Sequence, residues 1–255
     1  MRWYFIRVLG CPRLVADAMY WRGMATHERA DAVKVQTYHR DVLHCFHGPA
    51  VVHASGYQKW YVEGKLHRLD GPAIIHANCY QKWFVDGKLH RLDGPAVIHA
   101  NGDREWYVDD ERHRRDGPAV VAANGYQAWF LDGKRHRLDG PAAEFADGGK
   151  QWWVNDRRHR LDGPAVICAS GTKEYWLDGM RHRVDGPAAE YSYGSKEWWF
   201  HDKLHRQDGP AIVGADGSRH WYFDGKRHRL DGPAVEYSTG RKEWWIDGVR
   251  QADQE

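Results

Sequence analysis

The chain has 255 residues, and its 37 Lys and Arg residues nearly balance its 35 Asp and Glu residues. A net charge so close to zero excludes a protein that is drawn as a whole to nucleic acid or to acidic membranes. The 17 histidines are the exception, because their protonation would raise the net charge steeply below about pH 6.5.

The first 47 residues lack the pattern that fills the rest of the chain. Residues 1–10 are apolar for only a few positions before Arg7, so we expect no signal peptide. No apolar run approaches the ~18 residues that a membrane span needs. Residues 12–33 are the only candidate for a helix, and residues 37–47 look like a degenerate half-unit of the repeat that follows. We therefore expect residues 1–47 to form an N-terminal cap.

The sequence Gly-Pro-Ala then recurs nine times at intervals of 23 residues, without insertion or deletion. Its glycines are Gly48, Gly71, Gly94, Gly117, Gly140, Gly163, Gly186, Gly209 and Gly232. Such strict periodicity is typical of an array in which each unit contacts mainly its neighbours. Residues 48–255 are therefore expected to form nine equivalent units, closed by a polar C-terminal cap at residues 251–255.

One unit, residues 71–93, reads GPAIIHANCYQKWFVDGKLHRLD. Small and β-branched residues predict a first strand, and a two-residue turn such as Asn101-Gly102 favours a type I′ hairpin. A second, aromatic-rich strand follows, and a second turn such as Asp86-Gly87 leads to the next Gly-Pro. We expect an all-β fold, an elongated, twisted, single-layer antiparallel sheet of consecutive hairpins containing eighteen short strands.

The run from Trp83 to Ala96, WFVDGKLHRLDGPA, resembles the MORN repeat, including a glycine eight residues after Gly94. The resemblance covers residues 48–255, with His-Arg-x-Asp-Gly-Pro-Ala in place of the shorter His-Gly-x-Gly of the usual motif. The unit is similar to variant arrays of phages, giant viruses and bacteria. The resemblance implies one hairpin per unit, an elongated sheet, dimerisation, scaffolding roles and phospholipid-headgroup binding.

A His-Arg-x-Asp sequence precedes eight of the nine Gly-Pro pairs. The arginines are Arg68, Arg91, Arg114, Arg137, Arg160, Arg183, Arg206 and Arg229; we call them the arginine column. Equivalent residues of neighbouring units should lie ~10 Å apart, too far for two ligands of one metal ion. We interpret the triplets as structural, with His and Asp satisfying backbone groups of the turn and Arg stacking on an aromatic ring. The alternative is an anion-binding stripe.

Each unit also carries an adjacent pair of aromatic residues, such as Trp83-Phe84. Neighbouring residues of a strand point to opposite faces, so each face should receive one aromatic column. Sheet packing is the favoured role of these columns, with stacking on sugars, choline or bases as the alternative.

Positions that vary between units are free to contact a partner. Three histidines and three tyrosines predict a partner-binding patch towards the N-terminus, the N-terminal patch. Its members are His53, His76, His99, Tyr57, Tyr80 and Tyr126. Drift at solvated positions is the competing explanation.

The four cysteines, Cys11, Cys45, Cys79 and Cys168, share no spacing or repeat position. We expect unpaired thiols in a reducing, cytoplasmic compartment. The close spacing of His39, His44, Cys45 and His47 is a weak metal signal, which a capping role explains equally well. We expect no resident metal or cofactor.

These patterns favour a non-enzymatic protein-binding scaffold or adaptor, with a protein partner and a possible homodimer. The alternative is a small-anion, nucleotide or phospholipid-headgroup binder or sponge that uses the His/Arg stripe. By analogy with the viral arrays, either mode would serve to sequester a host protein or signalling molecule. An enzyme would need a singular nucleophile or metal cluster, and the repeats contain none.

Overall fold

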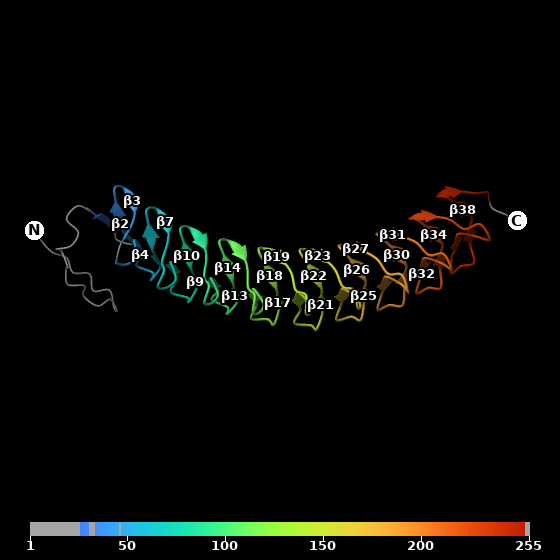
Figure 1. The fold of residues 1–255 in the computed structure, drawn as a ribbon, viewed down its shortest axis with the longest axis horizontal. Coiled ribbons are helices and arrows are strands. Elements are labelled where there is room, and N and C mark those ends of the chain that lie inside the picture. Colours follow the sequence, from blue (N-terminus) through green and yellow to red (C-terminus); the bar gives the residue numbers. More distant parts are fainter. Residues whose placement is uncertain (1–25, 31–33, 46, 253–255) are drawn as a thin grey trace, which may run out of the picture.

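The computed structural model describes residues 26–30, 34–45 and 47–252. These residues form no helix, and their strands follow one another as an open array with β2 near one end and β38 near the other (Figure 1). The all-β hairpin array expected from the sequence is confirmed. Residues 26–30, part of the candidate helix, form strand β1 instead; the rest of that segment lies outside the described residues.

Strand β1 (Thr26–Ala30) pairs with β2 (Lys34–His39), which also pairs with β3 (Val42–Leu43) and with the first strand of the first unit. The segment from β2 to His44 reproduces the second half of a unit. Its Thr37 N–H donates to Ala50 O, as Trp60 N–H donates to Ala73 O in the next unit. These residues thus repeat backbone hydrogen bonds of the second half of a unit.

Each of the nine units contributes two strands to one 21-stranded antiparallel sheet, in which β1, β2 and β3 are the remaining members. These eighteen strands are β4 (Val51–His53), β5 (Gln58–Lys59), β8 (Ile74–Ile75), β9 (Gln81–Lys82), β12 (Val97–Ile98), β13 (Arg104–Glu105), β16 (Val120–Val121), β17 (Gln127–Ala128), β20 (Ala143–Glu144), β21 (Lys150–Gln151), β24 (Val166–Ile167), β25 (Lys173–Glu174), β28 (Ala189–Glu190), β29 (Lys196–Glu197), β32 (Ile212–Val213), β33 (Arg219–His220), β36 (Val235–Glu236) and β37 (Lys242–Glu243).

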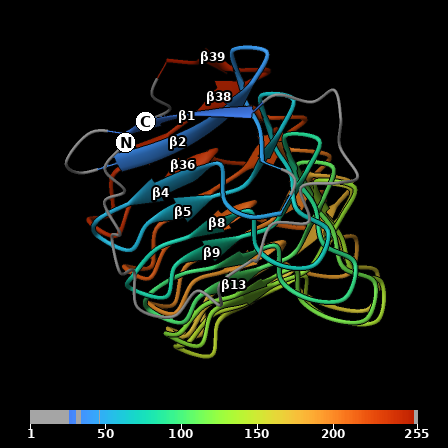
Figure 2. The ribbon, with the colours of Figure 1, turned by 90° about the vertical axis from the view of Figure 1, so that its left-hand side faces the viewer.

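Each unit also forms a second, smaller hairpin beside the sheet, where the MORN resemblance implied only one hairpin per unit. These pairs are β6 (Tyr61–Val62) with β7 (Lys65–Leu66), β10 (Phe84–Val85) with β11 (Lys88–Leu89), β14 (Tyr107–Val108) with β15 (Glu111–Arg112), β18 (Phe130–Leu131) with β19 (Lys134–Arg135), β22 (Trp153–Val154) with β23 (Arg157–Arg158), β26 (Trp176–Leu177) with β27 (Met180–Arg181), β30 (Trp199–Phe200) with β31 (Lys203–Leu204), β34 (Tyr222–Phe223) with β35 (Lys226–Arg227), and β38 (Trp245–Ile246) with β39 (Val249–Arg250). Figure 2, which looks along the array, shows the sheet and the column of small hairpins side by side.

The first turn of a unit differs from the sequence-based expectation. In the first turn only the glycine has positive φ, as at Gly102, and Gly102 N–H donates to His99 O while His99 N–H donates to Asp103 O. This is a three-residue loop in which a type I turn precedes a left-handed residue, so the predicted type I′ turn was wrong there. The type I′ geometry occurs in the second turn, where Asp86 has φ 49° and Gly87 has φ 83°.

The core is thin and made of small side chains. The alanine of every Gly-Pro-Ala is at most 1% exposed, and the next residue, such as Val97 or Val235, packs beside it. Side chains this small let neighbouring units approach closely, and the remaining stability must come from contacts that the array repeats. The described part of the chain contains no helix long and apolar enough to cross a membrane.

Candidate functional site

The arginine column is fixed by three contacts per residue. Arg91 places its guanidinium carbon 4.1 Å from the centre of the Trp83 ring, donates from Nε to Asp93 at 2.9 Å, and donates from Nη1 to Pro95 O at 3.3 Å. The same contacts recur in the other seven units, with Tyr175 replacing Trp beneath Arg183. The hydrogen bond from Arg91 lowers the pKa of the Asp93 carboxyl. The predicted stacking role of the arginines is confirmed.

The histidines of the triplets join each small hairpin to the next. His67 Nδ1 lies 3.1 Å from the backbone N–H of Asp86 and 3.0 Å from Asp86 Oδ1. A neutral imidazole protonated on Nε2 accepts the N–H, whereas a proton on Nδ1 is donated to the carboxylate. The predicted backbone role is therefore confirmed for the histidine. The carboxylate of the triplet's aspartate accepts a hydrogen bond from the arginine Nε and also from its own backbone N–H, as at Asp116.

These contacts weigh against the anion stripe. The arginine side chains are only 22–25% exposed, and each already has a carboxylate partner. An incoming phosphate would have to compete with both the aspartate and the ring. Among the described residues, no group of three or more His, Cys, Asp or Glu side chains could hold a metal ion.

The structure brings together four members of the N-terminal patch. Ring centres lie 4.3 Å apart for Tyr57 and His76, 5.1 Å for His76 and Tyr80, and 5.5 Å for Tyr80 and His99. His53 instead turns its Nδ1 to Ser55 Oγ at 2.8 Å. All these side chains are half-buried rather than freely solvated.

Tyr126 lies apart from that group. It packs against Phe145, with ring centres 5.2 Å apart, and against the core around Ala128. Asp103 takes the place of a tyrosine in the intervening unit, and its carboxylate accepts the Ala123 N–H at 2.7 Å. The six residues predicted from the sequence therefore do not form one continuous patch.

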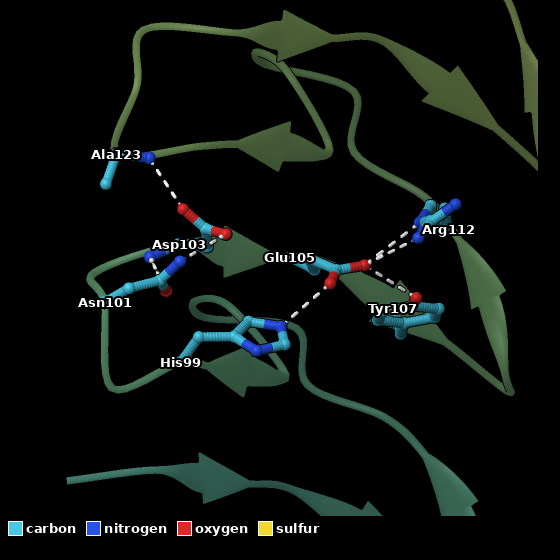
Figure 3. A network of polar contacts seen from close by, with 7 residues as sticks. All are labelled: His99, Asn101, Asp103, Glu105, Tyr107, Arg112 and Ala123. Atoms are coloured by element: carbon cyan, nitrogen blue, oxygen red, sulfur yellow. Dashed lines mark hydrogen bonds and ion pairs between the residues drawn. The ribbon is translucent and has the colours of Figure 1, made fainter. Parts of the chain in front are cut away.

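Glu105 contacts the last histidine of the N-terminal patch, His99 (Figure 3). One carboxylate oxygen contacts His99 Nε2 at 2.9 Å, and the other accepts the Tyr107 hydroxyl at 2.8 Å and Arg112 Nη2 at 2.9 Å. Burial alone would raise the pKa of Glu105, but the hydrogen bonds from Tyr107, Arg112 and His99 together lower it. His99 is thus anchored to this network and is not equivalent to His53 or His76.

The same sheet face carries two lysines that the sequence analysis did not single out. Lys59 Nζ lies 5.0 Å from the centre of the Tyr57 ring, and Lys82 Nζ lies 5.3 Å from that of Tyr80. Their position in the unit is the one that Glu105 occupies in the third unit, as the equivalent pairings of β5, β9 and β13 show. Comparing this position between units would have revealed the change of charge.

Further along this face, arginines alternate with the second aromatic column. Arg158 lies 5.2 Å from the Trp153 ring and 5.0 Å from the Trp176 ring, and Arg181 continues the series to Trp199. Glu174 accepts from Arg181 at 3.1 Å and from Trp176 Nε1 at 2.9 Å. One aromatic column therefore packs on each face of the array, as the strand alternation predicts, and here the charges are paired.

A row of exposed aliphatic side chains runs along the array at the variable position of His-Arg-x-Asp. We call Leu69, Leu92, Leu138, Leu161, Val184 and Leu230 the aliphatic row, and each is 77–83% exposed. Arg115 and Gln207 interrupt it. This position was not predicted from the sequence because its residues lie inside an otherwise charged motif, although their shared apolar character is visible there.

Grooves open beside the aliphatic row between consecutive units. One of these grooves has a volume of about 980 Å³, and its lining includes Leu92, Trp106 and the carboxylates of Asp93, Asp116 and Asp132. A similar groove of about 780 Å³ lies beside Val184. The grooves therefore combine apolar surface with exposed carboxylates.

The cysteines and the N-terminal histidines add no further site. Cys45, Cys79 and Cys168 are free thiols, as predicted, and Cys11 lies outside the described residues. His44 is 3% exposed and its Nδ1 accepts the Glu63 N–H at 3.1 Å, which is the contact that His67 makes with Asp86. The capping role fits this histidine.

A comparison of the chain with known protein families found no match, and a search of curated proteins found none either.

Proposed function

We propose that this protein is a non-enzymatic, MORN-like scaffold that binds an elongated protein partner along the aliphatic row. The main observation in support of this proposal is that six of eight equivalent positions hold a large aliphatic side chain that is about four-fifths exposed to solvent. Isolated exposed leucines are ordinary on protein surfaces. A row of such residues that recurs with the period of the fold repeats exposed apolar surface along the array, which is typical of an interaction site.

The energetics favour burial of this row by a partner. Fully burying one leucine side chain is worth about 1.5–3 kcal/mol, and none of the six residues gains this from the folded chain. The core is built from alanines and β-branched residues on other positions of the unit. The aliphatic row is therefore free to contribute to binding without cost to the fold.

The carboxylates beside the row define the partner's chemistry. Asp93 and Asp116 are 84–85% exposed even though each receives an arginine Nε, and Asp132 of the next turn is 82% exposed. We infer a partner segment that presents apolar side chains about 10 Å apart, the distance between equivalent residues of neighbouring units, with Lys or Arg between them. Charge complementarity would add specificity and speed of association.

The absence of catalysis is part of the proposal. The His-Arg-x-Asp triplets recur unchanged, and their side chains are engaged in stacking and in holding turns. The anion-binding alternative is less well supported because it would use these same arginines. The free thiols of Cys79 and Cys168 support a reducing, cytoplasmic site of action.

The test is affinity capture followed by cross-linking, comparing wild type with a Leu69→Ser, Leu92→Ser, Leu138→Ser, Leu161→Ser variant. We expect the variant to melt like wild type but to lose its partners, and the cross-linked partner segments to be basic and apolar. An Arg115→Ser, Gln207→Ser variant alters the same row without removing an aliphatic group and should retain them. Retention by both variants would contradict the proposal.

A further inference from the structure

Two lysines on the face of the N-terminal patch lie at equivalent positions of neighbouring units. Lys59 on β5 and Lys82 on β9 both pair with Ile74 on the intervening strand β8. Two strand spacings therefore separate them, or about 10 Å along the sheet. The side chains of both lysines are half-buried on the same face of the sheet.

The charge of these lysines is uncompensated within the described residues. Neither has a carboxylate partner there; each Nζ lies near a tyrosine ring instead. Burial, and then Lys34, lowers the pKa of Lys59. Burial, followed by Lys59 and Lys82, lowers the pKa of His76 between them, as expected where positive groups crowd together.

The rest of the face does not share this imbalance. At the same position of later units stand Glu105, Glu174, Glu197 and Glu243, and each of these has an arginine within 4 Å. The acidic side chains of this column are thus paired, whereas Lys59 and Lys82 are not. Unpaired positive charge gathers at the N-terminal end of the face.

Three aromatic rings lie next to one another beside the two lysines. The rings of Tyr57, His76 and Tyr80 lie in sequence with centres 4.3 and 5.1 Å apart. Half-buried rings offer apolar surface to a ligand while their polar edges stay in water. The group Tyr57, Lys59, His76, Tyr80 and Lys82 is called the cation–aromatic patch below.

We propose that the cation–aromatic patch binds an acidic peptide segment in the polyproline II conformation. Because this conformation has three residues per turn and a rise of about 3.1 Å per residue, carboxylates three residues apart lie on the same side of the peptide, about 9 Å from each other, which is close to the backbone separation of the two lysines. The apolar part of the peptide would lie on the rings of Tyr57 and Tyr80.

The test is fluorescence anisotropy on the full chain at low salt, with a labelled peptide carrying glutamate at every third position. A peptide with glutamine at those positions should bind at least tenfold more weakly. A Lys59→Gln, Lys82→Gln variant should lose at least tenfold in affinity for the glutamate peptide. Because arginine keeps the charge, Lys59→Arg, Lys82→Arg should retain binding, which separates lost charge from lost folding.

The matched control is Lys150→Gln, Lys173→Gln, which removes the same charge from exposed lysines on the opposite face. It should bind like wild type. Equal binding of both peptides, or an equal loss in the control, would overturn the proposal. So would displacement of the peptide by an equimolar amount of inorganic phosphate, which would indicate a small-anion site. A Leu138→Ser, Leu161→Ser variant should bind the peptide normally, so this site and the aliphatic row can fail separately.

Discussion

Arg91 and Gly94 are held together so closely that a Cβ on Gly94 would lie 2.8 Å from the guanidinium carbon of Arg91. The guanidinium is thereby enclosed between the Trp83 ring and the glycine backbone. Gly94 does not have positive φ, so close approach, not turn geometry, requires glycine here. The same relationship recurs at Gly71 and at every later Gly-Pro-Ala sequence, but not at Gly48, where Cys45 replaces arginine.

Replacing Gly94 with alanine should push the guanidinium of Arg91, the far end of a flexible side chain, off the Trp83 ring and so lower the free energy of unfolding by about 0.5–2 kcal/mol, the usual worth of such a cation–π contact. Gly48→Ala is the matched control, because its Cβ would lie 3.9 Å from Cys45 Sγ, an ordinary contact. Urea unfolding of the two variants measures the difference. Similar losses in both would contradict this account of the glycine.

Cys79→Gly should stabilise the protein by about 1 kcal/mol, because a side chain makes the left-handed conformation costly. Cys79 has φ 67°, whereas the equivalent first turns have glycine in the left-handed region, as at Gly102. The control is Cys168→Ala, which removes another exposed thiol without that strain and should change stability by less than about 0.5 kcal/mol. A urea midpoint for Cys79→Gly at or below that of wild type would disprove the prediction.

Acid should weaken the contact between the sixth and seventh units, where His182 meets His201. Burial, and then His201, lowers the pKa of His182 below 6.5, and the two rings lie 4.3 Å apart. Because the folded state binds this proton less readily than the unfolded state, its stabilising contribution is complete above about pH 6.5. That contribution is lost as the pH falls through 6.5 towards the lowered value.

His201→Asp restores the residue that most units place opposite this histidine, as Asp178 is opposite His159. We expect its urea midpoint to fall less than that of wild type between pH 7.5 and 5.0. His201→Asn is the uncharged control, which reproduces the pairing of Asn155 with His136, and should be intermediate. An equal fall in all three proteins would exclude the His182–His201 pair as the cause.

Glu105→Gln should lower the free energy of unfolding at pH 7 by about 1.5–3 kcal/mol, because hydrogen bonds to a charged carboxylate are replaced by weaker ones. The pKa of Glu105 is lowered in the folded state. Its contribution is therefore present above about pH 4.5 and is lost as the pH falls through the lowered value. Wild type and variant should converge in stability near pH 3.

The control for this prediction is Glu144→Gln. Glu144 is 37% exposed and lies 3.7 Å from Arg137 Nη1, so its loss should cost at most about 1 kcal/mol. A deficit for Glu105→Gln that stays constant down to pH 3 would show that packing, not charge, is responsible.

Much of the fold follows from the sequence alone. The 23-residue period sets the number of units, and strand alternation assigns the two aromatic columns to opposite faces, as the contacts of Trp83 and Trp176 show. Stacking of the arginine column was also predictable, because eight identical motifs without a singular residue indicate a structural role. These features depend on local periodicity, which a sequence displays directly.

Only the tertiary structure decided which side chains share a neighbourhood. The two turns of a unit differ in geometry because Asn101 in the first turn has negative φ, whereas Asp86 in the second turn has positive φ. The hairpins that flank each turn determine this difference. Tyr126 packs with Phe145 rather than with Tyr80, since Asp103 stands between them. The exposure of Leu92 and the unpaired charge of Lys82 likewise depend on what the neighbouring units place around them. Composition and spacing do not predict such contacts, because the contacts depend on how neighbouring units pack against each other.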